Sequence, residues 1–382
     1  MRILILGGDG YLGWPAAMFL SAKGHDICVV DNYFKRRIEK ELHIKPLIPV
    51  PDLQERSRVW NAITGKIIQL KIGDICDYTF LSEVFKVFEP ESVVHFAEQP
   101  SAPYSMMDRD KAVFTLTNNL VGTVNVIFVL KEFSPDTHLV KLGTMGEYGT
   151  PNIDIEEGYL EIEHNGRKDR MLFPKKPGSI YHMSKVHDSD ELYFSARIWD
   201  LRITDLNQGP VYGIETDETQ MDERLATCFY YDEIFGTVLN RFTVQAVTGI
   251  PLTVYGKGRQ IRGYINIRDV LQCVELALKH PSRKGEFKVF NQFTEQYSVL
   301  DLAASVKKVA DRLGYSVKIQ SIKNPRREDE EHYYNAKHTG LVELGLQPAY
   351  LTEEMIVGFI RKVEANKENI LMDRIMPKIT WG

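Results

Sequence analysis

Short apolar runs alternate with amphipathic segments along the first half of the chain. Residues 1–7 are rich in Ile and Leu, a helical pattern follows up to Ala22, and a second apolar run at 27–30 ends at Asp31. Aliphatic runs of this length indicate buried strands, and the amphipathic segments between them indicate crossover helices. Further apolar runs lie at 67–72, 92–97, 138–143 and 202–206. The alternation predicts an α/β fold with a Rossmann-type doubly wound parallel sheet.

The pattern changes in the second half of the chain, where the alternation weakens from about residue 215. Helices are predicted at 78–88, 179–198, 233–248, 268–280 and 299–313, with another that opens at Asn118 and Asn119, and short strands at 251–256 and 287–291. We therefore expect a Rossmann domain over residues 1–210. A smaller substrate-binding domain is expected mainly over 211–382, partly interleaved with the first.

Two segments interrupt the alternation. Residues 33–66 carry three consecutive basic residues and three prolines, and they are longer than a single crossover helix requires. They predict an insertion in the Rossmann domain whose charges lie on a solvated face. Residues 155–178 are polar and include Pro174 and Pro177, which predicts a loop able to cover a site.

Composition and charge narrow the class of protein. The 382 residues are 43% hydrophobic and 26% charged, as in soluble globular proteins, and the net charge of −5 gives no basic excess for nucleic acid. We find no apolar run that approaches the roughly 20 residues of a membrane span. The four cysteines are far apart, with no CxxC pair. This spacing argues against a metal site or disulfides and favours a reducing, cytoplasmic compartment.

Glycines follow the first strand in a GxxGxxG spacing at residues 7–13. Glycines allow the backbone to approach a pyrophosphate, and the start of the next helix offers unpaired N–H groups. Asp31, at the end of the second strand, can accept hydrogen bonds from the ribose hydroxyls and would repel a 2′-phosphate, which favours NAD over NADP. The alternative is a glycine-rich loop without a ligand.

Other residues are expected around the same NAD. Asp74 follows the third strand and is placed to touch the adenine edge, and Arg36 or Arg37 could lie over the adenine or ribose. The complete predicted NAD set is Gly7, Gly10, Tyr11, Leu12, Gly13, Asp31, Asn32, Arg36, Asp74, Ile75, Phe96, Ala97, Glu98, Asn118, Asn119, Tyr181 and Lys185.

Tyr181 and Lys185 lie four residues apart and therefore share one face of a predicted helix. A phenol with a pKa of about 10 is a poor base at neutral pH, but a nearby cation favours its phenolate. Thr144 ends a strand and points its hydroxyl toward the same edge of the sheet. Taken alone, Tyr181 and Lys185 could simply be two neighbours on a helix surface, and Thr144 could simply cap a helix or turn. Together they predict an oxidoreductase that acts on an alcohol.

Arginines in the second half of the chain suggest that the substrate with this alcohol group also has a diphosphate. Arg262 and Arg326 could bind a diphosphate, because the planar guanidinium matches phosphate oxygens. A surface salt bridge is the alternative for each.

The glycine motif, Asp31, Asn119-x-x-Gly122-Thr123, Thr144, the Tyr181–Lys185 pair and the segment around Arg262 resemble the extended short-chain dehydrogenases that act on nucleotide-sugars. Within these, four segments resemble the UDP-sulfoquinovose synthase family. They are Glu98–Ser105, Thr144–Gly149, Tyr181–His187 and the motif from Pro325 and Arg326 through Glu330 and Glu331 to Asn335. Pro100 is a departure, since plant members are expected to have Arg there.

The resemblance implies an enzyme that joins UDP-glucose and sulfite, with tightly bound NAD that is recycled in each turnover. It also implies a homodimer or higher oligomer, and a sulfite-supplying protein is a conceivable partner. The implied substrate-binding set is Gln99, Ser101, Thr144, Glu147, Tyr181, Asn207, Gln208, Val254, Tyr255, Arg262 and Arg326.

The resemblance also assigns catalytic roles. Tyr181 takes the proton of the glucose 4-hydroxyl, Lys185 assists it, and Thr144 binds the oxygen at C4. Related 4,6-dehydratases have an Asp-Glu pair directly after the Thr, where this chain has Met145 and Gly146. Glu147 and His182 are then the candidates for the acid and base at C6 and C5. A UDP-glucose 4-epimerase, a 4,6-dehydratase and a catalytically silent NAD-binding scaffold are the alternatives.

Overall fold

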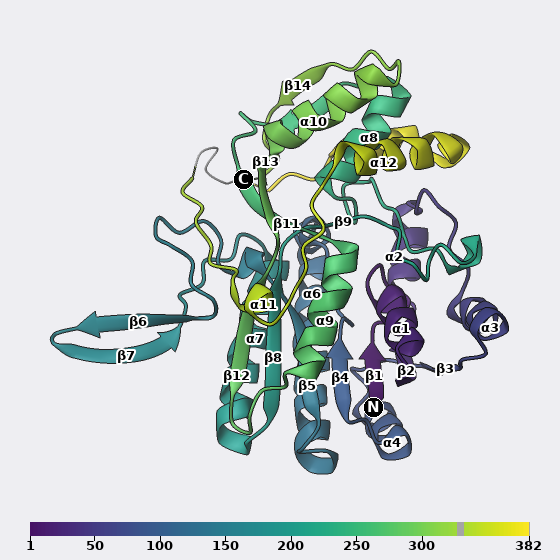
Figure 1. Cartoon of the computed structure of the whole chain (residues 1–382). Coiled ribbons are helices and arrows are strands. Elements are labelled where there is room, and N and C mark those ends of the chain that lie inside the picture. Colours follow the sequence, from purple (N-terminus) through teal and green to yellow (C-terminus); the bar gives the residue numbers. More distant parts are fainter. Residues whose placement is uncertain (327–331, 382) are drawn as a thin grey trace.

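A seven-stranded parallel sheet forms the centre of the molecule in the computed structural model, which describes residues 1–326 and 332–381 (Figure 1). The strand order is β12-β8-β5-β4-β1-β2-β3. The strands are β1 (Arg2–Leu6), β2 (Asp26–Asp31), β3 (Ile68–Ile72), β4 (Ser92–His95), β5 (His138–Thr144), β8 (Arg202–Gln208) and β12 (Phe287–Gln292). Strands β2 and β3 are added on one side of β1, and β4 and the later strands on the other, so the strand order reverses between β1 and β4. The predicted doubly wound α/β fold is therefore confirmed, and a ligand is expected at this switch point.

Helices cover both faces of the sheet. Alternate residues of β1 divide between two cores, because successive side chains of a strand point to opposite faces. Ile3 and Ile5 pack in one core with α1 (Gly13–Ala22), α3 (Leu53–Thr64) and α9 (Ile267–Lys279). Leu4 and Leu6 pack in the other with α4 (Tyr78–Phe88), α6 (Arg109–Phe133) and α7 (Ile180–Trp199).

The inserted segment after β2 forms two helices, α2 (Phe34–Leu42) and α3. Arg56 of α3 is fully buried, forms an ion pair with Asp9 of the glycine loop, and lies 4.9 Å from the centre of the Trp14 ring. The insertion is thus anchored to the loop that the sequence assigns to NAD.

A second, smaller region lies beyond the carboxyl ends of the strands (Figure 1). Its core joins α8 (Val238–Thr248), α10 (Val299–Arg312) and α12 (Glu353–Ala365) to the parallel pair β10 (Leu252–Tyr255) and β14 (Ile319–Ile322). A three-stranded sheet has the order β13 (Glu295–Ser298), β11 (Ile261–Asn266), β9 (Val211–Tyr212). The shorter helices are α5 (Ala102–Ser105), α11 (Gly340–Glu343), η1 (Met145–Glu147), η2 (Glu223–Leu225), η3 (Lys367–Asn369) and η4 (Met372–Arg374).

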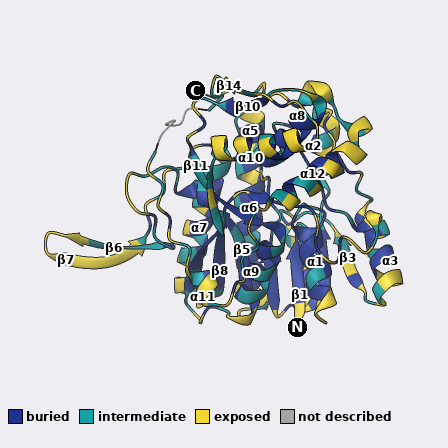
Figure 2. Cartoon of the chain, turned by 45° about the horizontal axis from the view of Figure 1, so that its top comes forward, coloured by how far each residue is buried: buried dark blue, intermediate teal, exposed yellow. Residues whose placement is uncertain are grey.

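The segment predicted as a covering loop, 155–178, is instead largely a β-hairpin. Its strands are β6 (Tyr159–His164) and β7 (Arg167–Leu172). The hairpin projects away from the body of the molecule and is mostly exposed (Figures 1 and 2). The hairpin therefore does not cover the site, whereas residues 176–178, which follow it, line the cavity at the carboxyl ends of the strands.

Helix α6 corrects two further predictions. It begins at Arg109, so Asn118 and Asn119 lie within the helix and do not open it. It is also long and apolar enough, by length and composition, to cross a membrane, with a mean hydropathy of 1.6 over its most apolar window. Half of that window is buried in the protein. It packs as a core helix against α4 and α7.

Candidate active site

A cavity of about 1150 Å³ lies at the carboxyl ends of the central strands, between the sheet and the smaller region. One wall is made by the glycine loop and the ends of β2, β4 and β5. The opposite wall comes from the smaller region and includes Tyr255, Arg262 and Arg326. This position at the switch point, and this size, suit a dinucleotide together with a second ligand.

The glycine loop has the geometry of a pyrophosphate cradle. Gly7 has φ +87°, and a Cβ there would lie 2.7 Å from the Ala97 nitrogen. A Cβ at Gly13 would lie 2.1 Å from the Gly7 carbonyl oxygen. Because Leu12, at the start of α1, has no side-chain acceptor, the first N–H groups of the helix stay available for a phosphate. The loop therefore fits NAD by its close backbone approach.

Asp31 lies on the cavity wall and has two fixed hydrogen bonds. Its Oδ2 accepts from the Asp9 N–H at 2.8 Å, and its Oδ1 accepts from the Tyr33 N–H at 2.7 Å. Burial raises the pKa of Asp31 to about 6, and the two backbone donors oppose that shift. The carboxylate is thus ionised at neutral pH and placed to accept from a ribose.

Arg36 is used inside the protein. Its guanidinium binds both carboxylate oxygens of Asp9, at 2.6 and 2.9 Å, and donates to the Pro51 carbonyl at 2.7 Å. It does not border the cavity among the described residues, whereas Lys35 does. The predicted contact of Arg36 with NAD is corrected, because its donors hold the insertion on the glycine loop.

Tyr181, Lys185 and Thr144 meet on the cavity wall, as their pattern predicted. Burial raises the pKa of Tyr181, while Lys185 and a hydrogen bond with Thr144 act against that rise. Lys185 Nζ donates to the Leu142 carbonyl at 2.6 Å. Thr144 also caps η1, since its hydroxyl accepts from the Gly146 N–H at 3.1 Å. Thr144 therefore both caps η1 and lines the cavity.

His182 takes the space that a side chain at position 146 would fill. A Cβ on Gly146 would lie 2.3 Å from His182 Nε2. His182 Nδ1 lies 3.0 Å from the Ser179 hydroxyl, which fixes the ring. Burial, followed by the charges of Arg326 and Arg262, lowers the pKa of His182 to about 3, so the imidazole is neutral. Gly146 and His182 are thus a matched pair beside Met145, at the positions directly after Thr144.

Glu147 is fully buried and does not reach the cavity. It pairs with Lys175 at 2.5 Å, and the Ser189 hydroxyl lies 2.9 Å from both Glu147 and Asp205. The Ser189 hydroxyl has one proton to donate, so the two carboxyls compete for it. Burial raises the pKa of Glu147 to about 7 and raises that of Asp205. The predicted catalytic and substrate contacts of Glu147 are corrected, because η1 turns its side chain toward Lys175.

Several other predicted residues also support the site without bordering it. Val254 is fully buried in the core of the smaller region, and Asn207 donates to the Tyr148 hydroxyl at 2.8 Å. Asp74 accepts from Asn32 Nδ2 at 2.8 Å. Each was predicted to contact a ligand. These predictions are corrected because none of the three side chains lines the cavity, although Asp74 bonds to Asn32, which does.

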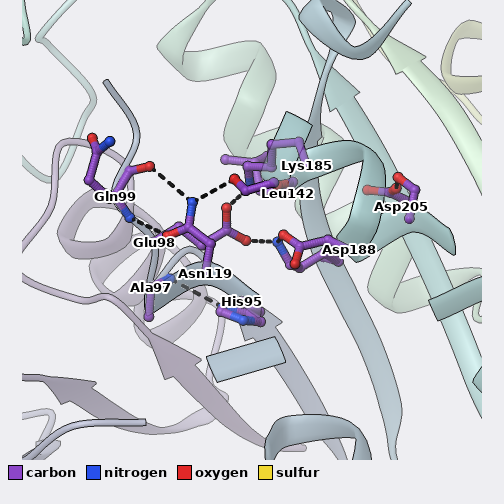
Figure 3. A network of polar contacts seen from close by, with 12 residues as sticks. His95, Ala97, Glu98, Gln99, Asn119, Leu142, Lys185, Asp188 and Asp205 are labelled. Atoms are coloured by element: carbon purple, nitrogen blue, oxygen red, sulfur yellow. Dashed lines mark hydrogen bonds and ion pairs between the residues drawn. The ribbon is translucent and has the colours of Figure 1, made fainter. Parts of the chain in front are cut away.

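Asn119 and Gln99 form an internal clamp (Figure 3). The Asn119 side chain accepts from the Gln99 N–H at 2.9 Å and donates to the Ser184 hydroxyl at 2.9 Å. Gln99 donates to the Thr115 hydroxyl at 2.8 Å. Their predicted ligand contacts are corrected to a structural role: they tie the loop after β4 to α6 and α7.

The remaining predicted residues border the cavity. At the cofactor end these are Gly7, Gly10, Tyr11, Leu12, Gly13, Asp31, Asn32, Ile75, Phe96, Ala97, Glu98 and Asn118, and at the substrate end Ser101, Gln208, Tyr255, Arg262 and Arg326. Glu330 and Glu331, which belong to the motif between Pro325 and Asn335, lie outside the described residues. No cluster of three metal-ligating side chains occurs in the described parts of the chain.

The sequence reasoning missed other residues of the substrate wall. Arg241 donates to the Tyr255 hydroxyl at 2.8 Å, and Trp381 lies 5.3 Å from the Arg326 guanidinium. Both border the cavity. Arg241 occupies a helix pattern and Trp381 an irregular segment, so neither had a motif to indicate it.

Comparisons with known proteins place this fold and site. The model of the NAD dependent epimerase/dehydratase family matches residues 3–291. UDP-sulfoquinovose synthase, chloroplastic, from Spinacia oleracea is 56% identical over 380 residues, covering 100% of this chain and 79% of that protein. UDP-sulfoquinovose synthase from Sulfolobus acidocaldarius is 45% identical over 384 residues, covering 100% and 98%.

Solved structures share the fold at low identity. The UDP-glucose 4-epimerase of Bifidobacterium longum, in complex with NAD+ and UDP, has a TM-score of 0.70 at 20% identity, covering 97% of this chain and 100% of that chain. The chain thus belongs to the NAD-dependent epimerase/dehydratase family, and NAD is its cofactor. Within this class it belongs to the UDP-sulfoquinovose synthases.

The NAD cradle gives a first prediction. Gly13→Val is expected to abolish NAD retention, because its Cβ would meet the Gly7 backbone, which has no room to move. The measurement is NAD released per purified chain after denaturation, with folding checked by circular dichroism. Gly358→Ala, where a Cβ meets no atom within 4 Å, serves as control. A folded Gly13→Val protein with full NAD content would contradict the assignment of the cradle.

Proposed function

We propose that this protein is a UDP-sulfoquinovose synthase, which converts UDP-glucose and sulfite into UDP-sulfoquinovose with loss of water. The observation that carries the proposal is the matched pair of Gly146 and His182 beside Tyr181, Thr144 and Lys185. It is supported by two relatives of that name that align with the whole chain. The site keeps the groups for oxidation of an alcohol and replaces the acidic pair of a dehydratase.

The first step uses Tyr181, Thr144 and Lys185. Tyr181 accepts the proton of the glucose 4-hydroxyl, Lys185 favours the phenolate, and Thr144 donates to the oxygen at C4. NAD, when bound, supplies the hydride acceptor for C4 and the hydride for its later reduction. The residues that would hold NAD are the glycine loop and Asp31.

Elimination and addition follow at C5 and C6. A ketone at C4 acidifies the C5 proton, so the C6 hydroxyl can leave as water. We assign His182 to take the C5 proton and pass it to the leaving C6 hydroxyl, since its neutral imidazole borders the cavity and Glu147 does not. Addition of bisulfite at C6 then returns a proton to C5. Met145 and Gly146 leave no carboxylate there, which favours the approach of anionic sulfite to C6. Arg262 and Arg326 are placed to hold the diphosphate.

One incubation tests the proposal against its alternatives. The purified protein is supplied with UDP-glucose, with and without sulfite. The products are separated by chromatography, which resolves the C4 epimers of equal mass, and are then analysed by mass spectrometry. A sulfonated sugar nucleotide that depends on sulfite is the expected result. UDP-galactose alone would identify an epimerase, and a 4-keto-6-deoxy sugar alone a dehydratase. Absence of turnover would favour a scaffold.

A homodimer through α6 and α7 is part of the proposal. These helices pack on each other and expose apolar side chains, among them Val121, Phe194 and Ile198. Phe194→Asp is expected to convert the dimer to a monomer in light scattering at micromolar concentration, because the charge would be desolvated in the interface. Met171→Asp, on the projecting hairpin, is the control. A monomeric wild-type protein would contradict the proposed dimer.

We further place the protein in the cytoplasm, with free sulfite or a sulfite-supplying protein as its sulfur source. Its four cysteines are free, in keeping with a reducing compartment. The spinach relative is named chloroplastic, so a plastid is the alternative. Cell fractionation with an antibody against the chain decides between them.

A further inference from the structure

Four buried charges of alternating sign extend from Lys185 into the protein, and Figure 3 labels three of them, Lys185, Glu98 and Asp188. Lys185 pairs with Glu98, Glu98 with Lys141, and Lys141 with Asp188 at 3.0 Å. The four side chains are at most 5% exposed. Lys185 is the one member that the proposed reaction uses.

The contacts restrict Lys185. Its ammonium donates to the Leu142 carbonyl at 2.6 Å and forms an ion pair with Glu98. An ammonium has three N–H donors, so a further one can serve Tyr181 or a ribose hydroxyl. A long lysine side chain would otherwise lose considerable rotamer freedom when it orders at the site. Glu98 thus fixes the ammonium before any ligand binds.

The charges also cross-link the elements that carry the reacting groups. Glu98 follows β4, Lys141 lies on β5 three residues before Thr144, and Asp188 lies on α7 seven residues after Tyr181. Positions seven apart share a helix face. The ion pairs therefore connect the strand that ends in Thr144 with the helix that carries Tyr181.

The sign of each charge determines its effect on Tyr181. Cations favour a phenolate and anions oppose it. Lys141 and Lys185 act in the first direction, Glu98 and Asp188 in the second. Burial lowers the pKa of Lys141 to about 8, and Asp188 opposes this shift, so Lys141 is charged at neutral pH.

Other titratable groups around Tyr181 lie on the neighbouring elements. They are Glu147 on η1, Lys175 after β7, Asp205 on β8, His95 on β4 and His182 on α7. Burial raises the pKa of Glu147 and of Asp205, and it keeps both histidines neutral. These groups remain unchanged in the variants below.

We propose that Glu98 and Lys141 are positioning residues that act through Lys185, fixing its ammonium and setting how readily Tyr181 gives up its proton. The proposal rests on Tyr181 acting as the base of the proposed function. Lys141 does not border the cavity, and the carboxylate of Glu98 is paired with the two lysines. Each balances the other, so their separate removal has opposite consequences for Tyr181.

The test is a double-mutant cycle read by pH. Glu98→Gln removes an anion and is expected to move the acid limb of the kcat/KM profile about one unit to lower pH. Lys141→Met removes a cation and is expected to move it about one unit to higher pH. The double variant is expected to return to within about half a unit of wild type. Lys23→Met, in a surface pair with Glu275, is the control.

A second readout does not depend on turnover. The phenolate absorbance of Tyr181 is obtained by subtracting, for each variant, the spectrum of the same protein carrying Tyr181→Phe. It is expected to titrate with the same opposite displacements. Shifts of equal sign, or none, in folded Glu98→Gln and Lys141→Met proteins would overturn the proposal.

A conservative variant covers the case in which Lys141→Met does not fold. Asp188→Asn leaves Lys141 paired with Glu98 and is expected to displace the titration in the direction of Glu98→Gln. Displacement the other way would overturn the proposal. If wild-type protein makes no sulfonated product while the opposite phenolate shifts are seen, the proposed function fails and the electrostatic coupling stands.

Discussion

Tyr181→Phe is expected to lower formation of the sulfonated sugar nucleotide by about 10²- to 10⁴-fold, the usual contribution of a positioned acid–base group. Phenylalanine keeps the ring and its packing but cannot take the proton of the 4-hydroxyl. The pKa of Tyr181 is raised by burial, and Lys185 and Thr144 oppose this rise. The wild-type rate should therefore increase with pH as the phenol ionises.

The measurement is the initial rate with UDP-glucose and sulfite, together with NAD content and UDP-glucose affinity. Both binding quantities are expected to stay within about threefold, because the lost hydroxyl acts mainly in the transition state. Tyr193→Phe is the matched control, since Tyr193 lies on the same helix and packs against Tyr159 and Phe287 away from the cavity. A Tyr181→Phe protein with near-normal turnover would remove Tyr181 from the reaction.

Gly146→Ala is expected to have the second largest effect and to separate two halves of the reaction. The added methyl would lie 2.3 Å from His182 Nε2, so the ring must leave its position and its contact with Ser179. Sulfonated product is expected to fall by about 10²-fold or more, as for a lost proton-transfer group. The reduction of bound NAD by UDP-glucose, followed by absorbance at about 340 nm, should change less than threefold, because Tyr181 is not displaced.

Two variants make this test specific. Gly178→Ala adds a methyl to another glycine on the cavity wall, where no atom lies within 4 Å, and is expected to be neutral. In a protein that already carries His182→Ala, the change Gly146→Ala should cost little more, since the collision is gone. Full additivity of the two losses would mean that Gly146 acts independently of His182, contrary to the geometry.

Local signals were sufficient for much of the site. The glycine loop, Asp31 and the Tyr181–Lys185 pair are each defined by residues close in sequence. A strand–glycine–helix turn or one helix face then brings their groups together whatever the rest of the chain does. The prediction that they share one edge of the sheet is confirmed by the cavity wall.

The failures came where one residue had several possible partners. Arg36, Asn207 and Gln99 have side chains suited to a ligand, but each is nearer to a protein acceptor or donor in the fold. A buried polar group is rarely left unpaired, so these side chains bond internally. Sequence alone does not reveal which partner is nearest.

By itself, the sequence determined the fold class, the glycine loop and the candidate groups for oxidation of an alcohol, because strand and helix periods place neighbouring residues predictably. The tertiary structure alone decided that Glu147 turns to Lys175 and that His182 occupies the space above Gly146. It also decided that Glu98, Lys141 and Asp188 form one chain of charges behind Lys185. These contacts join β4, β5, η1 and α7, and their distances depend on packing between elements, which no local pattern encodes.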